Sequence, residues 1–206
     1  MNALQMQTIL DHAPVGTVIG MRPAPTFNLF RKFVSWQIQR YQKRLFPRAS
    51  RVSPAAVEIT HVLQYLGAGE VWEFTAPRAR RIRLDQVAGE VYGFAVPVRL
   101  VPMDPDLVRR RWLAVEGKEY DYLDLMDFLL YEVLRYPRAT TPFFSGLLGL
   151  GKDRFVCSTM IAAVFREFGR DRGIYNLLPS VPVELTTPAH FFLSPADFDC
   201  HLLYNL

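Results

Sequence analysis

Residues 57–74 read VEITHVLQYLGAGEVWEF. Between Val57 and Leu66 the side chains would alternate between the two faces of an extended chain, and every second residue, including His61, would share one face. This period of two predicts a strand. Gly67-Ala68-Gly69 then indicates a turn, and the apolar run Val71–Phe74 predicts the returning strand. The stretch therefore predicts a hairpin of an antiparallel sheet.

The same hairpin places a histidine and a carboxylate near each other. If the turn centres on Gly67, His61 lies directly opposite Glu73. Directly paired residues have Cβ atoms about 5 Å apart, which is within reach of a hydrogen bond between glutamate and imidazole. We therefore expect Glu73 to orient the His61 ring.

A cysteine begins the next informative segment. After Cys157, apolar side chains recur at helical spacing as far as Phe168, and Gly169 predicts the helix end. Unpaired N–H groups and the helix dipole at the first turn favour a thiolate, lowering the thiol pKa from its ordinary value of about 8.5. Cys157, His61 and Glu73 then fit the roles of nucleophile, base and orienting carboxylate.

Each of these residues also has a structural interpretation. A lone cysteine is often a small buried apolar residue, and a lone histidine on an apolar strand is often a core residue. A glutamate on a strand is often simply solvated. The catalytic interpretation requires Cys157 and His61 to meet in space.

The rest of the chain predicts a mixture of strands and helices in an α+β protein. Further strands are expected at Val15–Met21, Arg81–Leu84 and Gly93–Leu100, where Pro97 indicates an edge or a bulge. Further helices are expected at Phe27–Phe46, Asp106–Val115 and Tyr122–Tyr136. The segment Thr140–Asp153 is expected to be a loop, and the tail from Leu178 to be mostly irregular.

Composition narrows the class of protein. The chain has 206 residues, half of them hydrophobic, which predicts one domain over residues 1–206 with a sizeable core. Two cysteines do not make a disulfide scaffold. Residues 1–17 resemble no secretory signal, and no window approaches the roughly 20 apolar residues of a membrane span. We therefore expect a cytoplasmic protein, peripheral to a membrane if it binds one.

Positive charge is concentrated in the segment 27–50 and its surroundings. Between Asp11 and Glu58 there are eight arginines and lysines and no acidic residue. The Phe27–Phe46 helix has apolar residues at steps of three or four, with the basic residues largely on the other side. Such a helix suits an anionic membrane surface; the alternative is a surface helix docked on the protein's own core. Nucleic-acid binding through the arginine clusters is not expected, because no recognisable nucleic-acid-binding motif accompanies them.

The order of these motifs resembles a known family. Gly16–Ile19, Ile59–Val62, Val71–Phe74, Glu116–Tyr122, Phe155–Ser158 and Thr187–Pro195 follow one another as in circularly permuted NlpC-type papain-like hydrolases. That superfamily includes the YiiX-like and lecithin retinol acyltransferase-like proteins. The resemblance spans about residues 14–200, with 27–50 as a basic helical insertion. The chain departs from its relatives at Thr159, where an acidic residue is common, and at Phe155, where a tyrosine is common.

The resemblance implies a permuted papain-like fold, in which the antiparallel sheet packs against the nucleophile helix. It also implies a cysteine hydrolase or acyltransferase with a Cys157-His61-Glu73 triad, acting on an amide, peptide or acyl-ester bond through a thioester. The Cys157 N–H is expected to help hold the oxyanion. The alternative is a catalytically inactive binding or structural module of the same fold that docks through its basic face.

No cofactor or metal is expected. The glycines and lysine of 146–153 resemble a phosphate-binding loop, but Asp153 stands where a serine or threonine is needed. Asp199-Cys200-His201, together with His190, matches no standard zinc spacing.

Overall fold

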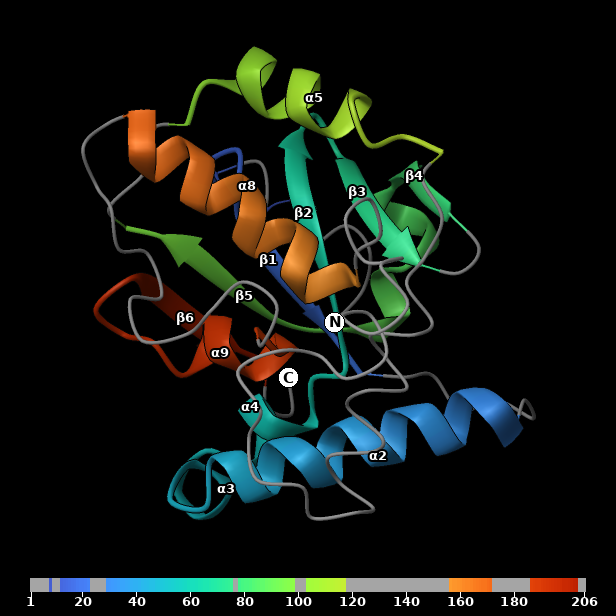
Figure 1. The fold of residues 1–206 in the computed structure, drawn as a ribbon, viewed down its shortest axis with the longest axis vertical. Coiled ribbons are helices and arrows are strands. Elements are labelled where there is room, and N and C mark those ends of the chain that lie inside the picture. Colours follow the sequence, from blue (N-terminus) through green and yellow to red (C-terminus); the bar gives the residue numbers. More distant parts are fainter. Residues whose placement is uncertain are drawn as a thin grey trace, which may run out of the picture.

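The structure is a computed structural model that describes residue 8 and residues 12–22, 29–75, 78–98, 103–117, 156–171 and 186–203. These residues form an α+β fold around one six-stranded antiparallel sheet (Figure 1). The strands are β1 (Val18–Met21), β2 (His61–Gly67), β3 (Glu70–Thr75), β4 (Arg78–Arg83), β5 (Val91–Pro97) and β6 (Phe198–Leu202). Their order across the sheet is β4-β3-β2-β1-β5-β6.

Helices surround this sheet. They are α2 (Leu29–Leu45), α3 (Ala49–Val52), α4 (Pro54–Glu58), α5 (Pro105–Leu113), α8 (Cys157–Asp171) and α9 (Pro188–Phe192), with the 3-10 turns η1 (Leu84–Gln86) and η2 (Ala88–Glu90). Helix α8 crosses one face of the sheet and contacts β2 and β3, while α2, α3 and α4 lie together at the lower side of the view (Figure 1). No helix in the described part of the chain is long and apolar enough to cross a bilayer.

Apolar side chains fill both faces of the sheet. On the α8 face, Val62 and Trp72 pack with Ile161 and Phe165, and the Trp72 ring stacks on Trp112 of α5 with ring centroids 5.2 Å apart. On the other face, a smaller cluster is formed by Ile19, Met21, Leu63, Tyr65, Val71, Leu84 and Phe94. Burial of this apolar area is the main stabilising contribution to such a fold.

The predicted strand Val57–Leu66 begins later than its alternation suggests. Residues Pro54–Glu58 form α4, and β2 starts at His61. Proline is favoured in the first turn of a helix, because its missing N–H would be unpaired there, and two alanines that favour helix follow Pro54. Val57 is therefore a buried residue of α4, and it does not belong to the strand face that carries His61.

The tail from Leu178, predicted to be mostly irregular, contains a short helix and a strand within its described residues 186–203. Pro188 begins α9, whose first turn is closed by a capping box between Thr187 and His190, and Phe198–Leu202 adds the edge strand β6. Because β6 pairs with β5, Pro97 lies at the end of an inner strand opposite Phe198, and the expectation that it marks an edge or a bulge is wrong.

The other helix and strand predictions that fall on described residues are confirmed within about three residues. Helix α8 continues past Gly169 to Asp171, and β4 begins at Arg78, three residues before its predicted start. The predicted helix Tyr122–Tyr136, the loop Thr140–Asp153 and the phosphate-loop look-alike at 146–153 lie outside the described residues.

One polar side chain fixes α2 to the fold. Gln42 is fully buried, and its Nε2 donates to the carbonyls of Val57, at 3.0 Å, and Ile59, at 2.8 Å. Its Oε1 accepts from the N–H of Ala189 at 2.8 Å. A single amide thus satisfies backbone groups at the C-terminal end of α4 and the first turn of α9, which would otherwise be unpaired.

Candidate active site

The register of the β2–β3 hairpin differs from the prediction. Glu73 lies directly opposite Leu63, so His61 is its diagonal neighbour on the same strand face. The turn is displaced because Ala68 adopts a positive φ of 52° and the register shifts between Tyr65 and Gly67. A shift of two residues keeps both side chains on one face, whereas a shift of one would have separated them.

Glu73 links His61 to a residue that the sequence did not single out. His61 Nε2 lies 3.4 Å from Glu73 Oε1, an ion-pair contact longer than an ordinary hydrogen bond. The other oxygen, Oε2, accepts from Arg80, with Nη2 at 2.7 Å and Nε at 2.8 Å. Arg80 lies opposite Glu73 in the β3–β4 ladder and so holds the carboxylate from the side away from the histidine.

Cys157 is the first residue of α8, and two side chains of the first turn of this helix form hydrogen bonds with the backbone. Thr159 Oγ1 accepts from the N–H of Val156 at 3.0 Å, and Ser158 Oγ donates to the Thr186 carbonyl at 2.6 Å. Thr159 therefore closes the helix start. The cysteine itself is buried, with 5% of the residue exposed.

The structure brings the thiol and the imidazole together. The Cys157 thiol and the His61 ring are close enough for each to shift the pKa of the other, and the backbone of Val62 and Ser158 also lowers the pKa of the thiol. Nε2 is the ring nitrogen nearest the Glu73 carboxylate. The three predicted residues are thus contiguous in space, in the order Cys157, His61, Glu73.

The electrostatics of the group favour a charged pair. Burial alone would raise the pKa of Cys157, but the His61 charge and the hydrogen bonds to the sulfur outweigh burial and lower it. Burial alone would lower the pKa of His61, but the thiolate, and then Glu73, raise it to about 10. Burial alone would likewise raise the pKa of Glu73, but the neighbouring His61 and Arg80 lower it. These pKa directions favour a thiolate–imidazolium pair next to an ionised carboxylate.

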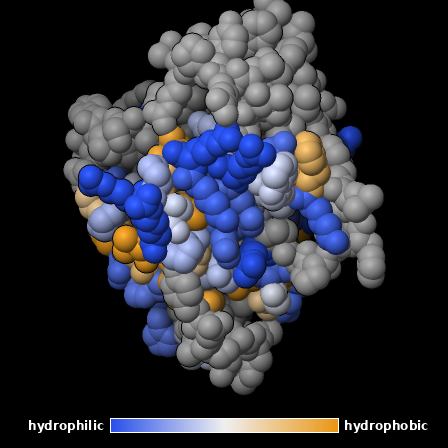
Figure 2. Space-filling view, turned by 90° about the horizontal axis from the view of Figure 1, so that it is seen from below, coloured by the Kyte–Doolittle hydropathy of each residue, from blue (hydrophilic) through white to orange (hydrophobic). Residues whose placement is uncertain are grey.

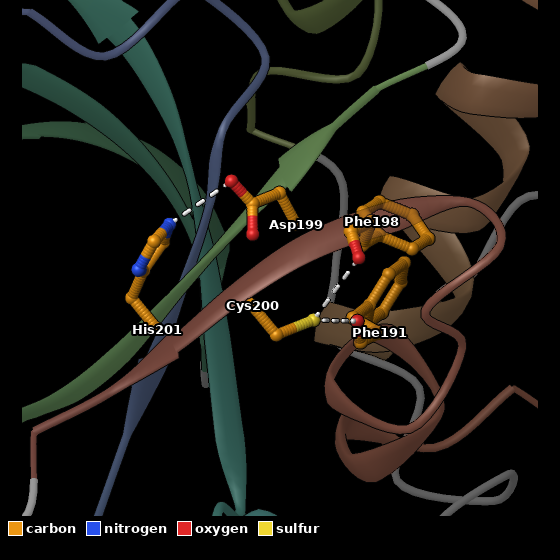
Figure 3. Close-up of polar contacts among 5 residues, drawn as sticks. All are labelled: Phe191, Phe198, Asp199, Cys200 and His201. Carbon is orange, nitrogen blue, oxygen red and sulfur yellow. Dashed lines mark hydrogen bonds and ion pairs between the residues drawn. The ribbon is translucent and has the colours of Figure 1, made fainter.

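The second cysteine has the opposite character. Cys200 on β6 donates to the carbonyls of Phe191, at 3.3 Å, and Phe198, at 3.6 Å, while His201 and Asp199 face each other on the other side of the strand (Figure 3). Burial and the nearby Asp199 raise the pKa of Cys200 to about 11. The described residues contain no group of three or more histidine, cysteine or acidic side chains arranged to hold a metal ion.

Sequence reasoning missed Arg80, the effect of the Val62 and Ser158 backbone on the thiol and the closure by Thr159. Arg80 was detectable in principle, because two residues separate the ends of β3 and β4 and a tight connection aligns Glu73 with Arg80. The backbone effect depends on how α8 meets β2, which no local pattern encodes. Comparison of the chain with protein-family models, curated proteins and solved structures finds no match.

The pH dependence of thiol alkylation tests the charged pair. We expect the rate of Cys157 labelling by iodoacetamide to fall only as pH drops through a pKa below the ordinary thiol value, since the thiolate persists above its lowered pKa. Cys200 should react appreciably only as pH approaches about 11. Peptide mass spectrometry over a pH series gives both profiles in one sample. Identical profiles for the two cysteines in the folded protein would contradict the pair.

Proposed function

We propose that the chain is a cysteine-dependent hydrolase or acyltransferase that acts on an amide, peptide or acyl-ester bond. The proposal is carried by one observation: Cys157 begins a helix and contacts His61, which in turn faces Glu73. Three residues from separate parts of the chain meet in the order that nucleophilic acyl transfer needs.

The chemistry follows from this arrangement. The Cys157 thiolate attacks the carbonyl carbon, and the oxyanion formed is held by backbone N–H groups, for which the Cys157 N–H at the start of α8 is the nearest candidate. The His61 imidazolium gives its proton to the leaving amine or alkoxide as the carbon–heteroatom bond breaks, and a thioester remains. Neutral His61 then takes a proton from water or an acceptor alcohol or amine, whose attack releases the acyl group and restores the thiolate.

Glu73 and Arg80 act through His61. The carboxylate favours the imidazolium and fixes the ring orientation, and Arg80 keeps the carboxylate ionised and in place. An ion pair whose arginine is largely exposed adds little to stability, because solvent screens it. The position of Glu73 next to His61 is therefore better accounted for by chemistry than by folding.

The observed fold supports a permuted papain-like assignment. A histidine strand followed by a carboxylate strand, with the cysteine helix packed on both and placed late in the chain, is the order implied by the family resemblance. The α+β architecture with an antiparallel sheet has the layers that the resemblance requires. The order and placement of these elements are the basis on which we propose this fold for the chain.

The second candidate is an inactive module of the same fold. The observation in its favour is the burial of Cys157, because a nucleophile has to be reached by its substrate. The two candidates differ in one measurable property, the ability of Cys157 to carry an acyl group.

Acyl trapping separates them. With p-nitrophenyl acetate at neutral pH, we expect a burst of nitrophenolate and an acetyl adduct on Cys157 that neutral hydroxylamine removes, as a thioester requires. Cys200→Ser should behave as the unmodified protein, and Cys157→Ala should lose the burst. A folded protein that takes no acetyl group on Cys157, or takes it equally on Cys200, would refute the proposal and favour the module.

A further inference from the structure

The solvent-facing side of α2 combines exposed aromatic rings with positive charge. At 3.6 residues per turn, its exposed side chains fall within roughly 120° of the helix circumference. We call them the α2 stripe: Lys32, Phe33, Trp36, Arg40, Lys43 and Arg44. Phe33 is 48% exposed and Trp36 is 51% exposed, which is unusual for large apolar side chains on a helix that has a core to pack on.

The exposure is not caused by a loosely held helix. On its other side, Gln42 fixes α2 to α4 and α9, and Gln39 Nε2 donates to the Glu58 carbonyl at 3.2 Å. The half-buried Val34, Ile38, Tyr41 and Leu45 follow the apolar periodicity of the sequence. The core-facing side is therefore already occupied, and Phe33 and Trp36 remain about half exposed on the opposite side.

The surface continues into α3. Arg48 and Arg51 are exposed there, and Val52 is 86% exposed. Three of the five exposed large hydrophobic residues in the described part of the chain thus lie on α2 and α3, among basic side chains. Figure 2 looks at the molecule from below, the side on which α2 lies in Figure 1, and shows hydrophilic residues across this face with pale and orange residues among and beside them.

We propose that the α2 stripe, with Arg48, Arg51 and Val52, is a docking surface for an anionic phospholipid bilayer. Basic residues near such a surface attract its negative charge, and tryptophan and phenylalanine bury their rings at the headgroup level. No acidic residue between Asp11 and Glu58 opposes this attraction. Two rings and one valine suit adsorption parallel to the surface, with the helix lying in the interface.

The geometry of the rings favours lipid over nucleic acid. Single-stranded nucleic acid is usually bound by open aromatic faces on which bases stack. Here the Arg40 guanidinium lies over the Trp36 ring, 5.2 Å from its centroid, and the Phe33 ring is tilted 39° to that of Trp36. The two rings form a tilted cluster and not a series of parallel platforms.

Vesicle co-sedimentation tests the proposal on the whole protein. At about 0.15 M salt, we expect binding to phosphatidylcholine vesicles that contain about one-third phosphatidylserine, and at least tenfold weaker binding to phosphatidylcholine alone. Lys32→Glu with Lys43→Glu should weaken binding to the anionic vesicles at least tenfold. Phe33→Ser with Trp36→Ser should also weaken it several-fold, and raised salt should not restore it.

Matched variants on other elements are the controls. Arg78→Glu with Arg110→Glu makes the same charge change on exposed residues of β4 and α5, and Leu113→Ser removes a similarly exposed apolar side chain from α5. Both should bind within twofold of the unmodified protein. Equal losses in the two charge variants, absence of binding to anionic vesicles, or tighter binding to single-stranded DNA than to vesicles would overturn the proposal.

The proposal is independent of catalysis. Cys157→Ala should bind vesicles as the unmodified protein does, because Cys157 lies on α8 and is not part of the α2 stripe. In the unmodified protein, absence of acyl trapping with vesicle binding intact would refute only the proposed enzyme activity, and acyl trapping without vesicle binding would refute only the docking surface.

Discussion

Replacing His61 with alanine will slow the labelling of Cys157 by iodoacetamide at pH 7 by roughly 30- to 100-fold. Without the imidazolium, burial is the dominant influence on the thiol and its pKa returns to its ordinary value of about 8.5 or above. At pH 7 only a few per cent of such a thiol is ionised. Acyl transfer will fall further, by about 10²- to 10⁴-fold, because the general acid and base is also lost.

The measurement has internal and external controls. Cys200 in the same protein should label at its own slow rate in both variants, since burial and Asp199 and not His61 set its pKa. His201→Ala removes an exposed histidine that faces Asp199 on β6 and should leave Cys157 labelling unchanged. His61→Asn keeps a polar side chain and guards against misfolding, which circular dichroism monitors. Equal labelling of Cys157 with and without the histidine would remove His61 from the mechanism.

The residues of the proposed triad could be selected from the sequence because each carries a local signal. A cysteine before a helical run and a histidine in an alternating strand each follow from a short pattern, and a glutamate in the returning strand shares the histidine's face. The predicted register was wrong by two residues. The histidine and the glutamate still share a strand face, because side chains alternate between the faces with a period of two. The contact between Cys157 and His61, almost a hundred residues apart, came only from the order of motifs in the resemblance.

The errors have physical causes that single-sequence patterns do not reveal. The short helices that begin at Pro54 and Pro188 were not predicted, although proline is favoured in the first turn of a helix. Phe33 and Trp36 interrupt the basic side of α2, and no helical pattern assigned them a role. Gln42 gave no signal at all, because a buried amide is recognised only by the backbone groups that it joins.

Gln42 is also where the largest loss of stability is expected. Gln42→Leu has a similar size but cannot hydrogen-bond, so it leaves the carbonyls of Val57 and Ile59 and the N–H of Ala189 without this partner. Each unsatisfied buried group costs about 1–3 kcal/mol, and the added apolar contact offsets part of this. We expect the free energy of unfolding, measured by urea denaturation, to fall by about 3–5 kcal/mol.

Gln39 provides the matched comparison on the same helix. It is only partly buried and donates one bond, at 3.2 Å, to the Glu58 carbonyl, so Gln39→Leu should cost about 1 kcal/mol or less. The difference in unfolding free energy between the two variants gives the contribution of the hydrogen bonds that join α2 to α4 and α9, because any general effect of leucine on α2 is common to both. If both variants lose the same stability, Gln42 does not join these helices, and α2 is held in place by its apolar contacts alone.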